Sequence, residues 1–485
     1  AKKPAVQENY VRSPGSELAR APAPDSLDAM PTVPPTVPVL KSHHLLGHLP
    51  AMRDDMLGLQ LRALREVGDI ARLRTGPGNV VMVSSPAYAQ EVLTERQEDY
   101  EKSATLTVFI RPITGDGILS SQGSRHKRRR QIVAPAFQAN RIARYHDTIV
   151  RETDRVLARF EPGSRLDFGE AMLHLTLEIV GATLFNANVQ SDIDLVGRAV
   201  TRGSEAVTQL MRSTLMLPPS RFTAVGRKLL RAGAELDSVV YRILRERRAS
   251  GEDPGDVLSM LLGARDAESG EGLSDVELRD EVMTLFLAGH ETTANALTWS
   301  LALISRHPEV AARLAAEVDA LDGRAPSFED LAKLPYALAV FKEAMRLYPP
   351  AYLVGRTALT ETRIGKHRLP RGQVVFVNIY GIHRRADLFP DPDAFKPERF
   401  LDGGEKRLPK GAFLPFGGGP RICVGNHFAL MEAQLVLARL AQRFELAGCM
   451  PGALPEGEPL ITLRPKTRIE MNVVPRQREA VRRAG

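Results

Sequence analysis

Apolar residues recur with helical spacing through the central part of the chain, from about residue 124 to residue 347. Spacings of three and four residues place such side chains on one face of an α-helix. The pattern predicts a mainly helical core, with its longest helices at 140–160, 169–186, 222–249 and 275–305. The sequence has no internal repeat with a fixed period.

Shorter segments rich in β-branched residues lie on either side of this helical region. Residues 70–73 and 80–83 precede most of it, and residues 374–377 and 469–474 follow it. Such residues in short runs favour strands. We therefore predict a smaller β-rich lobe. The span 187–222 has no clear period, and we predict an irregular region rich in loops and helices there.

The N-terminal segment is predicted to be a tail over residues 1–33, followed by closely spaced prolines in 31–38. Proline lacks an amide proton and its ring disrupts a helix, so this stretch favours extended backbone. A second short tail is predicted at 479–485. No apolar run is long enough to cross a bilayer, and no signal-peptide core is present, so we expect no membrane span.

Charge and cysteine content narrow the possible classes of protein. Two cysteines, Cys423 and Cys449, are too few for a disulfide framework, so we expect a reducing, cytoplasmic location. The formal net charge is +7, and the densest basic run is Arg125–Arg130. Such a run suits a solvated helix face, a nucleic-acid patch or a docking site for an acidic protein. No zinc-finger or RNA-binding pattern accompanies it, so nucleic acid is not expected.

The most specific chemical pattern is the stretch Phe416-Gly-Gly-Gly-Pro-Arg-Ile-Cys-Val-Gly425. Its glycines let backbone amides approach a sulfur atom, Phe416 can shield that sulfur, and Arg421 supplies a cation. A thiolate protected in this way can be an axial ligand of haem iron. A buried structural cysteine is the alternative. The spacing F-x-x-G-x-R-x-C-x-G resembles the haem-binding loop of the cytochrome P450 family.

The resemblance covers about residues 35–475 and implies the family's fold, which is mainly α with a smaller β-rich lobe. Haem b would lie between a long distal helix and the proximal cysteine loop, with Cys423 as its thiolate iron ligand and Phe416 beside the sulfur. A single domain over 34–478 is implied, although 485 residues alone would suggest roughly three domains. No C-x-x-C-H motif for covalent haem attachment is present. Because no apolar anchor is found near its N-terminus, the chain resembles the soluble, bacterial-type members of the family.

A second pattern lies in the helix predicted at 275–305. It begins at a capping box in 274–277 and continues through Ala-Gly-His-Glu-Thr-Thr at 288–293. Glycine and threonine are poor choices inside a helix. From this segment alone, Thr292 could simply bond to its own helix and Glu291 could face solvent.

This stretch resembles the family's A-G-x-[DE]-T-T pattern, which lies across the distal face of the haem. The resemblance implies that the helical hydrogen-bond ladder opens near Gly289 to make a groove for dioxygen, with Ala288 lining the pocket. Thr292 would hydrogen-bond the oxygen undergoing reduction. Glu291 would belong to a proton relay, because two protons must reach that oxygen.

Two further motifs follow in the family's order. Glu343 and Arg346 form E-x-x-R, which by itself usually marks a weak surface salt bridge. Arg399 lies in Pro-Glu-Arg-Phe at 397–400. The resemblance implies a structural network of these three side chains. It also nominates four basic residues for the haem propionates, which need cations when buried: His126, Arg130, Arg356 and Arg421.

The implied reaction inserts one atom of dioxygen into a hydrophobic small molecule, such as a fatty acid, terpenoid, steroid or polyketide. Only about sixty residues follow Cys423, too few for an appended reductase. We therefore expect a monomer served by an external ferredoxin or flavodoxin with its reductase, docking near Arg128. A peroxide-dependent enzyme and a non-catalytic haem sensor are the alternatives, and the Glu291–Thr292 pair argues against both. The residues expected in the substrate pocket are Phe286, Ala288, Leu353, Val354 and Ile461.

Overall fold

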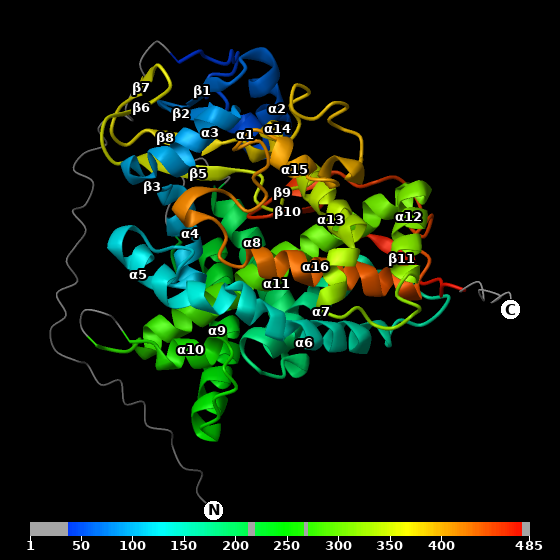
Figure 1. The fold of residues 1–485 in the computed structure, drawn as a ribbon. Coiled ribbons are helices and arrows are strands. Elements are labelled where there is room, and N and C mark those ends of the chain that lie inside the picture. The colour runs from blue at the N-terminus through cyan, green and yellow to red at the C-terminus, as the bar shows by residue number, and fades with distance from the viewer. Residues whose placement is uncertain (1–36, 212–218, 266–269, 478–485) are drawn as a thin grey trace, which may run out of the picture.

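The structure is a computed structural model and describes residues 37–211, 219–265 and 270–477. Helices form a large lobe, and the main sheet lies at one end of it, at the top of Figure 1. The helices of the large lobe are α4 (Ala104–Thr114), α5 (Gly123–Val133), α6 (Ala139–Leu157), α7 (Phe168–Leu184), α8 (Ile193–Met211), α9 (Ala224–Ser250), α10 (Val257–Gly263), α11 (Asp275–Arg306), α12 (Pro308–Asp319), α13 (Pro335–Leu347) and α16 (Asn426–Arg443).

The smaller lobe is built on a five-stranded sheet with the order β1-β2-β8-β5-β3. Strands β2 and β8 are parallel and the other neighbours are antiparallel. Its strands are β1 (Ile70–Thr75), β2 (Gly78–Val83), β3 (Tyr100–Lys102), β5 (Val354–Ala358) and β8 (Val374–Val377). Short helices accompany the sheet: α1 (Leu49–Asp54), α2 (Met56–Glu66), α3 (Pro86–Gln90), α14 (Ile379–Ile382) and α15 (Gly404–Arg407).

Three two-stranded ribbons complete the described strands. They are β4 (Arg165–Asp167) with β11 (Glu470–Asn472), β6 (Thr362–Ile364) with β7 (His367–Leu369), and β9 (Gly457–Pro459) with β10 (Leu463–Pro465). The turn between β9 and β10 matters for the site, because it brings a C-terminal segment against the middle of α11, where Trp299 Nε1 donates to the Leu463 carbonyl at 3.3 Å.

Helix α11 is the central element of the large lobe. It begins at the predicted capping box, in which the side chains of Ser274 and Glu277 bond each other's backbone amides. From Leu278 onward most of its side chains are buried, so neighbouring helices surround it. At Gly289 a Cβ atom would lie only 3.0 Å from the Val180 Cγ2 of α7, so the glycine allows a close approach of these two helices.

The predicted elements agree with the structure at most positions. The four long predicted helices correspond to α6, α7, α9 and α11, each within three residues at either end, and the predicted strand segments correspond to β1, β2, β8 and β11. The tails predicted at 1–33 and 479–485 lie outside the described residues. Within the described ranges, we find no helix that is both long enough and apolar enough to traverse a bilayer.

The span 187–222 was predicted to be irregular and rich in loops and helices, and more than half of it is one regular helix. Residues 193–211 form α8, a 19-residue helix with Val196, Val200 and Val207 buried on one face. Gly203 weakens the local helical preference, which hid the pattern. Tertiary packing explains that glycine, because a Cβ atom there would lie 2.9 Å from the Ile113 Cδ1 of α4. Residues 212–218 lie outside the described part of the chain.

Candidate haem site

The cysteine loop runs into α16 and is fixed by backbone contacts. The Cys423 amide donates to the Phe416 carbonyl at 3.0 Å, and Arg130 Nη1 on α5 donates to the Ile422 carbonyl at 2.7 Å. Gly419 has a φ of +66°, and a Cβ there would lie 1.8 Å from the Leu93 carbonyl oxygen. Only glycine satisfies both the left-handed conformation and this close approach.

The Cys423 side chain keeps accessible surface, whereas Cys449, the second cysteine, is buried. Protein atoms nevertheless surround Cys423 on its other sides, and this removal from bulk solvent raises the pKa of its thiol. The Gly425 amide and the Arg130 guanidinium act in the opposite direction and favour the thiolate. A bound metal ion deprotonates a coordinating thiol outright, so this environment suits a metal ligand better than a free nucleophile.

Five basic side chains converge beside the loop: Lys102, His126, Arg130, Arg356 and Arg421. Burial, followed by the other cations, lowers the pKa of His126 to about 3 and that of Lys102 to about 7. Burial and the Arg421 charge lower the pKa of Arg356 to about 10. These buried cations repel one another, and a ligand with negative groups would relieve that repulsion. The donor set therefore fits the two propionates of a haem.

Lys102 is the member of this group that sequence reasoning missed. Its Nζ donates to the carbonyls of Ile118 and Leu119, both at 2.8 Å, and of Ser121 at 3.2 Å. In the sheet it pairs directly with Arg356. Gln122 joins the group, because its Oε1 accepts from the Lys102 amide and from Arg421 Nη1, both at 3.1 Å. No local motif marks Lys102, since only the pairing of β3 with β5 brings it here.

Helix α11 carries the predicted distal residues. Ala288 is exposed although it lies in the middle of this otherwise buried helix. The Thr292 hydroxyl donates to the Ala288 carbonyl at 2.7 Å, the local bond that the sequence left open as an alternative. The expected opening of the helical ladder near Gly289 does not appear, because α11 is one uninterrupted α-helix. The close packing of Gly289 on Val180 accounts for this glycine instead.

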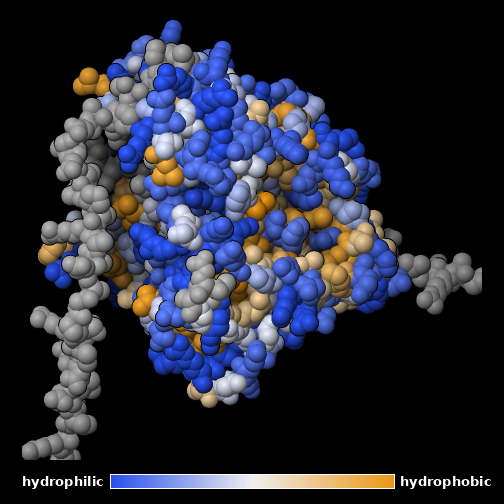
Figure 2. Space-filling model, turned by 60° about the vertical axis from the view of Figure 1, so that its left-hand side comes forward, coloured by the Kyte–Doolittle hydropathy of each residue, from blue (hydrophilic) through white to orange (hydrophobic). Residues whose placement is uncertain are grey.

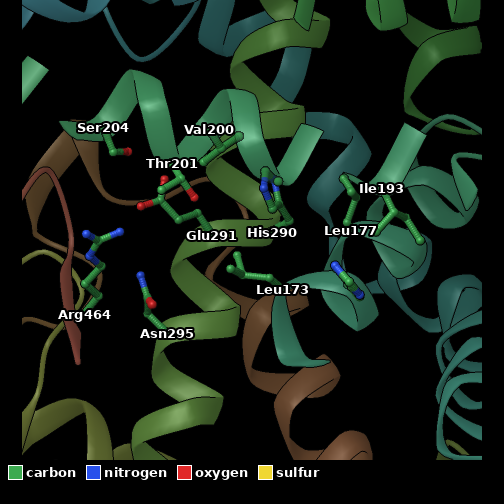
Figure 3. Close-up of a pocket in the computed structure, with 12 residues that line it drawn as sticks. Leu173, Leu177, Ile193, Val200, Thr201, Ser204, His290, Glu291, Asn295 and Arg464 are labelled. Carbon is green, nitrogen blue, oxygen red and sulfur yellow. The ribbon is translucent and has the colours of Figure 1, made fainter. Parts of the chain in front are cut away.

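Glu291 lies at a small cavity of about 40 Å³ between α7, α8 and α11. Figure 3 shows its carboxylate reaching from α11 towards the side of Thr201 and Arg464. Its Oε1 accepts a hydrogen bond from the Thr462 hydroxyl at 2.8 Å. Burial raises the pKa of Glu291, while the Thr462 bond and the Arg464 charge lower it. Glu291 therefore does not face open solvent, contrary to the alternative that the sequence allowed.

The residues predicted for the substrate pocket lie in different surroundings. Leu353, Val354 and Ile461 are partly buried, and the segments that carry them are joined by two hydrogen bonds, from Tyr352 Oη to the Leu460 carbonyl and from the Leu463 amide to the Pro350 carbonyl. Phe286 is fully buried, with its ring packed beside those of Phe185 and His290. It is therefore not carried into the proposed pocket.

The structure brings the three residues of the expected network together. Glu343 and Arg346 are completely buried and form a bidentate pair, with N–O distances of 2.7 and 2.8 Å. Arg399 Nε lies 3.2 Å from Glu343 Oε1. Arg346 also donates to the carbonyls of His383, Pro392 and Ala394, at 2.6–3.0 Å. These contacts tie α13 to the segment before the cysteine loop.

The side chains of the basic run on α5 point partly to solvent and partly to α11. Arg125 and Lys127 are exposed. Arg129 is buried and lies 3.1 Å from Glu281 on α11, and Arg128 contacts Glu277 at 3.1 Å. A docking face was expected for part of this run, and Arg128 and Arg129 are already paired with carboxylates of α11. Arg129 serves the packing of α5 on α11, because a buried arginine needs a carboxylate partner.

The comparisons with known proteins agree with this geometry. Residues 35–472 match the sequence model of the Cytochrome P450 family. Cyclooctat-9-en-7-ol 5-monooxygenase of Streptomyces melanosporofaciens is 35% identical, across 86% of this chain and 89% of the relative. Cyclooctatin synthase of the same organism is 37% identical, across 86% and 91%. Pentalenene oxygenase of Streptomyces avermitilis is 30% identical, across 86% and 91%. The chain therefore belongs to the cytochrome P450 family and is a haem-thiolate monooxygenase.

Proposed function

We propose that this monooxygenase hydroxylates a terpenoid, with Cys423 as the iron ligand. Cys423, an exposed residue in a loop beside which five basic side chains gather, is the observation that carries the assignment of the haem site. The substrate class rests on the relatives named after cyclooctat-9-en-7-ol, cyclooctatin and pentalenene. The apolar residues Leu353, Val354 and Ile461 are suited to such a hydrocarbon skeleton.

Each group of residues then has a defined task toward haem b within the single domain at 34–478. Cys423 binds the iron, and Phe416 covers the sulfur. His126, Arg130, Arg356 and Arg421 would bind the propionates, and Lys102, whose three N–H donors are taken by backbone carbonyls, would add positive charge beside them. When bound, haem supplies the redox centre at which dioxygen is activated. The apolar pocket residues keep bulk water away from the reacting carbon, which limits the loss of electrons to side reactions.

The distal residues handle protons. The Thr292 hydroxyl is held beside the accessible surface of Ala288 by its bond to the Ala288 carbonyl. Its one proton is used in this bond, so as it stands the hydroxyl can accept a further hydrogen bond, and it can donate to an oxygen on the distal side once it turns from the Ala288 carbonyl. Glu291 is the neighbouring acid, and burial raises the pKa of its carboxyl, which favours the protonated form. An acid beside an alcohol is the arrangement that general acid catalysis requires.

Two single electrons must come from another protein. We infer an external ferredoxin or flavodoxin with its reductase, acting on a monomer of this chain. Arg125 and Lys127 are the exposed members of the basic run on α5; Arg125 lies 3.1 Å from Asp116, and Lys127 is the cation that we assign to an acidic donor there. The same helix supplies Arg130 to the cysteine loop, so a donor docked on α5 lies close to the haem site. One face of the molecule is mostly hydrophilic, as a transient docking surface requires (Figure 2).

The decisive experiment is the absorption spectrum of the haem-loaded protein, reduced and exposed to carbon monoxide. We expect a strongly red-shifted Soret band that is lost in Cys423→Ala and retained in Cys449→Ala, the matched control. In a second arm, reduced ferredoxin, its reductase and NADPH replace dithionite, and Lys127→Glu slows the appearance of the band. Pentalenene and cyclooctat-9-en-7-ol then serve as probes for incorporation of isotopically labelled oxygen. A red-shifted band that survives in Cys423→Ala would overturn the ligand assignment.

A further inference from the structure

The Glu291 carboxylate is held by a segment far away in the sequence. Thr462, in the turn between β9 and β10, donates its hydroxyl proton to Glu291 Oε1 at 2.8 Å. The same hydroxyl oxygen accepts a hydrogen bond from Asn295 Nδ2 at 3.0 Å. An amide N–H can only donate, and a threonine hydroxyl has a single proton. With Glu291 ionised, the direction of the chain is therefore fixed, from Asn295 through Thr462 to Glu291.

This arrangement is almost entirely buried. Thr462 is 7% exposed and Asn295 is 8% exposed. A buried hydroxyl that both accepts and donates holds its partner in one orientation, because moving either group would leave a polar atom unpaired. Thr462 therefore fixes where the Glu291 carboxyl points.

The turn that carries Thr462 also contributes to the proposed substrate pocket. Ile461 is the residue directly before it. The turn is anchored on both sides, by the bond from Tyr352 Oη to the Leu460 carbonyl and by the bond from the Leu463 amide to the Pro350 carbonyl. A substrate that displaces Ile461 therefore also displaces the hydroxyl that holds Glu291.

On its other side Glu291 faces the cavity of about 40 Å³. A buried water needs roughly 10–15 Å³ of such space together with polar partners, so the cavity has room for about three or four waters. Four apolar side chains, Leu173, Leu177, Ile193 and Val200, form much of its wall. The charged or titratable groups that share it with Glu291 are His290 on α11, His174 on α7 and Arg464 on β10, and α8 contributes none.

We propose that Thr462 is a positioning residue that holds the Glu291 carboxyl at this cavity, so that the substrate-pocket turn controls proton supply to the distal site. The inference rests on the role of Glu291 under the proposed function. In the step concerned, the carboxyl proton of Glu291 is consumed in the reduction of dioxygen on the Thr292 side, and a water in the cavity reprotonates the carboxylate while it takes up a proton from bulk water in turn. No electron moves in this reprotonation, and the hydroxyl of Thr462 keeps its own proton.

The test uses the haem-loaded protein and three threonine variants. Thr462→Val removes the hydroxyl with little change of shape, and Thr462→Ser keeps it. Thr298→Val is the matched control. Thr298 is buried on α11, the helix that carries Glu291, and its hydroxyl donates to the Ala294 carbonyl at 2.7 Å rather than to Glu291. Thermal unfolding of all three variants reports whether the turn still folds.

The first readout is independent of turnover. The carbonyl stretch of protonated Glu291 is recorded by infrared spectroscopy as a function of pH and assigned by its loss in Glu291→Gln. In Thr462→Val we expect the titration to move to higher pH and the band to change frequency, because the carboxylate loses a hydrogen-bond donor. Thr462→Ser and Thr298→Val should titrate like the wild type. An unchanged band in Thr462→Val would overturn the proposal.

The second readout is the fraction of electrons lost to hydrogen peroxide, with pentalenene as the probe and ferredoxin, its reductase and NADPH as the electron source. In Thr462→Val we expect this fraction and the solvent deuterium isotope effect to rise several-fold, while the KM for the probe stays near that of the wild type. A change in KM alone would mean that Thr462 is only part of the pocket wall, which refutes the inference. If Glu291→Gln itself leaves the peroxide fraction unchanged, the proposed role of Glu291 fails. If Glu291→Gln changes the peroxide fraction but Thr462→Val does not, the proposed role of Glu291 stands and the inference about Thr462 is refuted.

Discussion

Replacing Glu432 by glutamine should remove a large part of the pH dependence of stability. Glu432 lies in α16 and is completely buried. Within the part of the chain that the structure describes, neither of its carboxylate oxygens has a hydrogen-bond partner. Burial therefore raises the pKa of Glu432 well above 4.5, its ordinary value. An unpaired carboxylate is so costly in such a place that the side chain keeps its proton.

The sign and size of the effect follow from linkage. Above pH 4.5 the unfolded chain releases the Glu432 proton and the folded chain retains it, so the unfolded state binds one proton fewer. The free energy of unfolding then falls as pH rises, by about 1.4 kcal/mol per pH unit, until the folded protein also loses the proton. Between pH 5.5 and 7.5 this amounts to about 2.7 kcal/mol for as long as the proton is retained.

The assay is urea unfolding of the haem-loaded protein at several pH values in this range. Glu432→Gln keeps the shape of the side chain but cannot ionise, so its free energy of unfolding should fall less steeply with pH than that of the wild type. At pH 7.5 the variant should be the more stable protein. Glu98→Gln, which changes an exposed acid, is the control and should follow the wild type. Parallel slopes for Glu432→Gln and the wild type would refute the reasoning.

Two further outcomes test the supports of the site. Arg346→Met should destabilise the protein by about 3–5 kcal/mol in urea unfolding, because it leaves Glu343 buried with a weaker partner, whereas Arg368→Met, at an exposed ion pair, should cost less than about 1 kcal/mol. Lys102→Met should speed haem transfer to apomyoglobin, and the exposed Lys127→Met should not. Equal transfer rates would remove Lys102 from the propionate site.

The fold and the site were predictable where the signal is local. Capping at Ser274 and Glu277 depends on residues three apart, so the start of α11 could be predicted from the sequence. α8 was missed because the apolar face of a helix containing Gly203 is explained only by Ile113, far away in the chain. Lys102 and Thr462 carry no motif, and they reach the site only through strand pairing and through a turn between two strands.

By itself, the sequence determined the cysteine loop, the order of the family's motifs, the helical core and the small β-rich lobe. These depend on spacing within short stretches, where backbone geometry fixes which side chains share a face. Only the tertiary structure decided that Arg129 faces Glu281 and that Glu291 is held by Thr462. Such contacts join residues more than a hundred positions apart. Whether a charged side chain meets water or a partner is set by the packing of whole elements, and no local pattern records it.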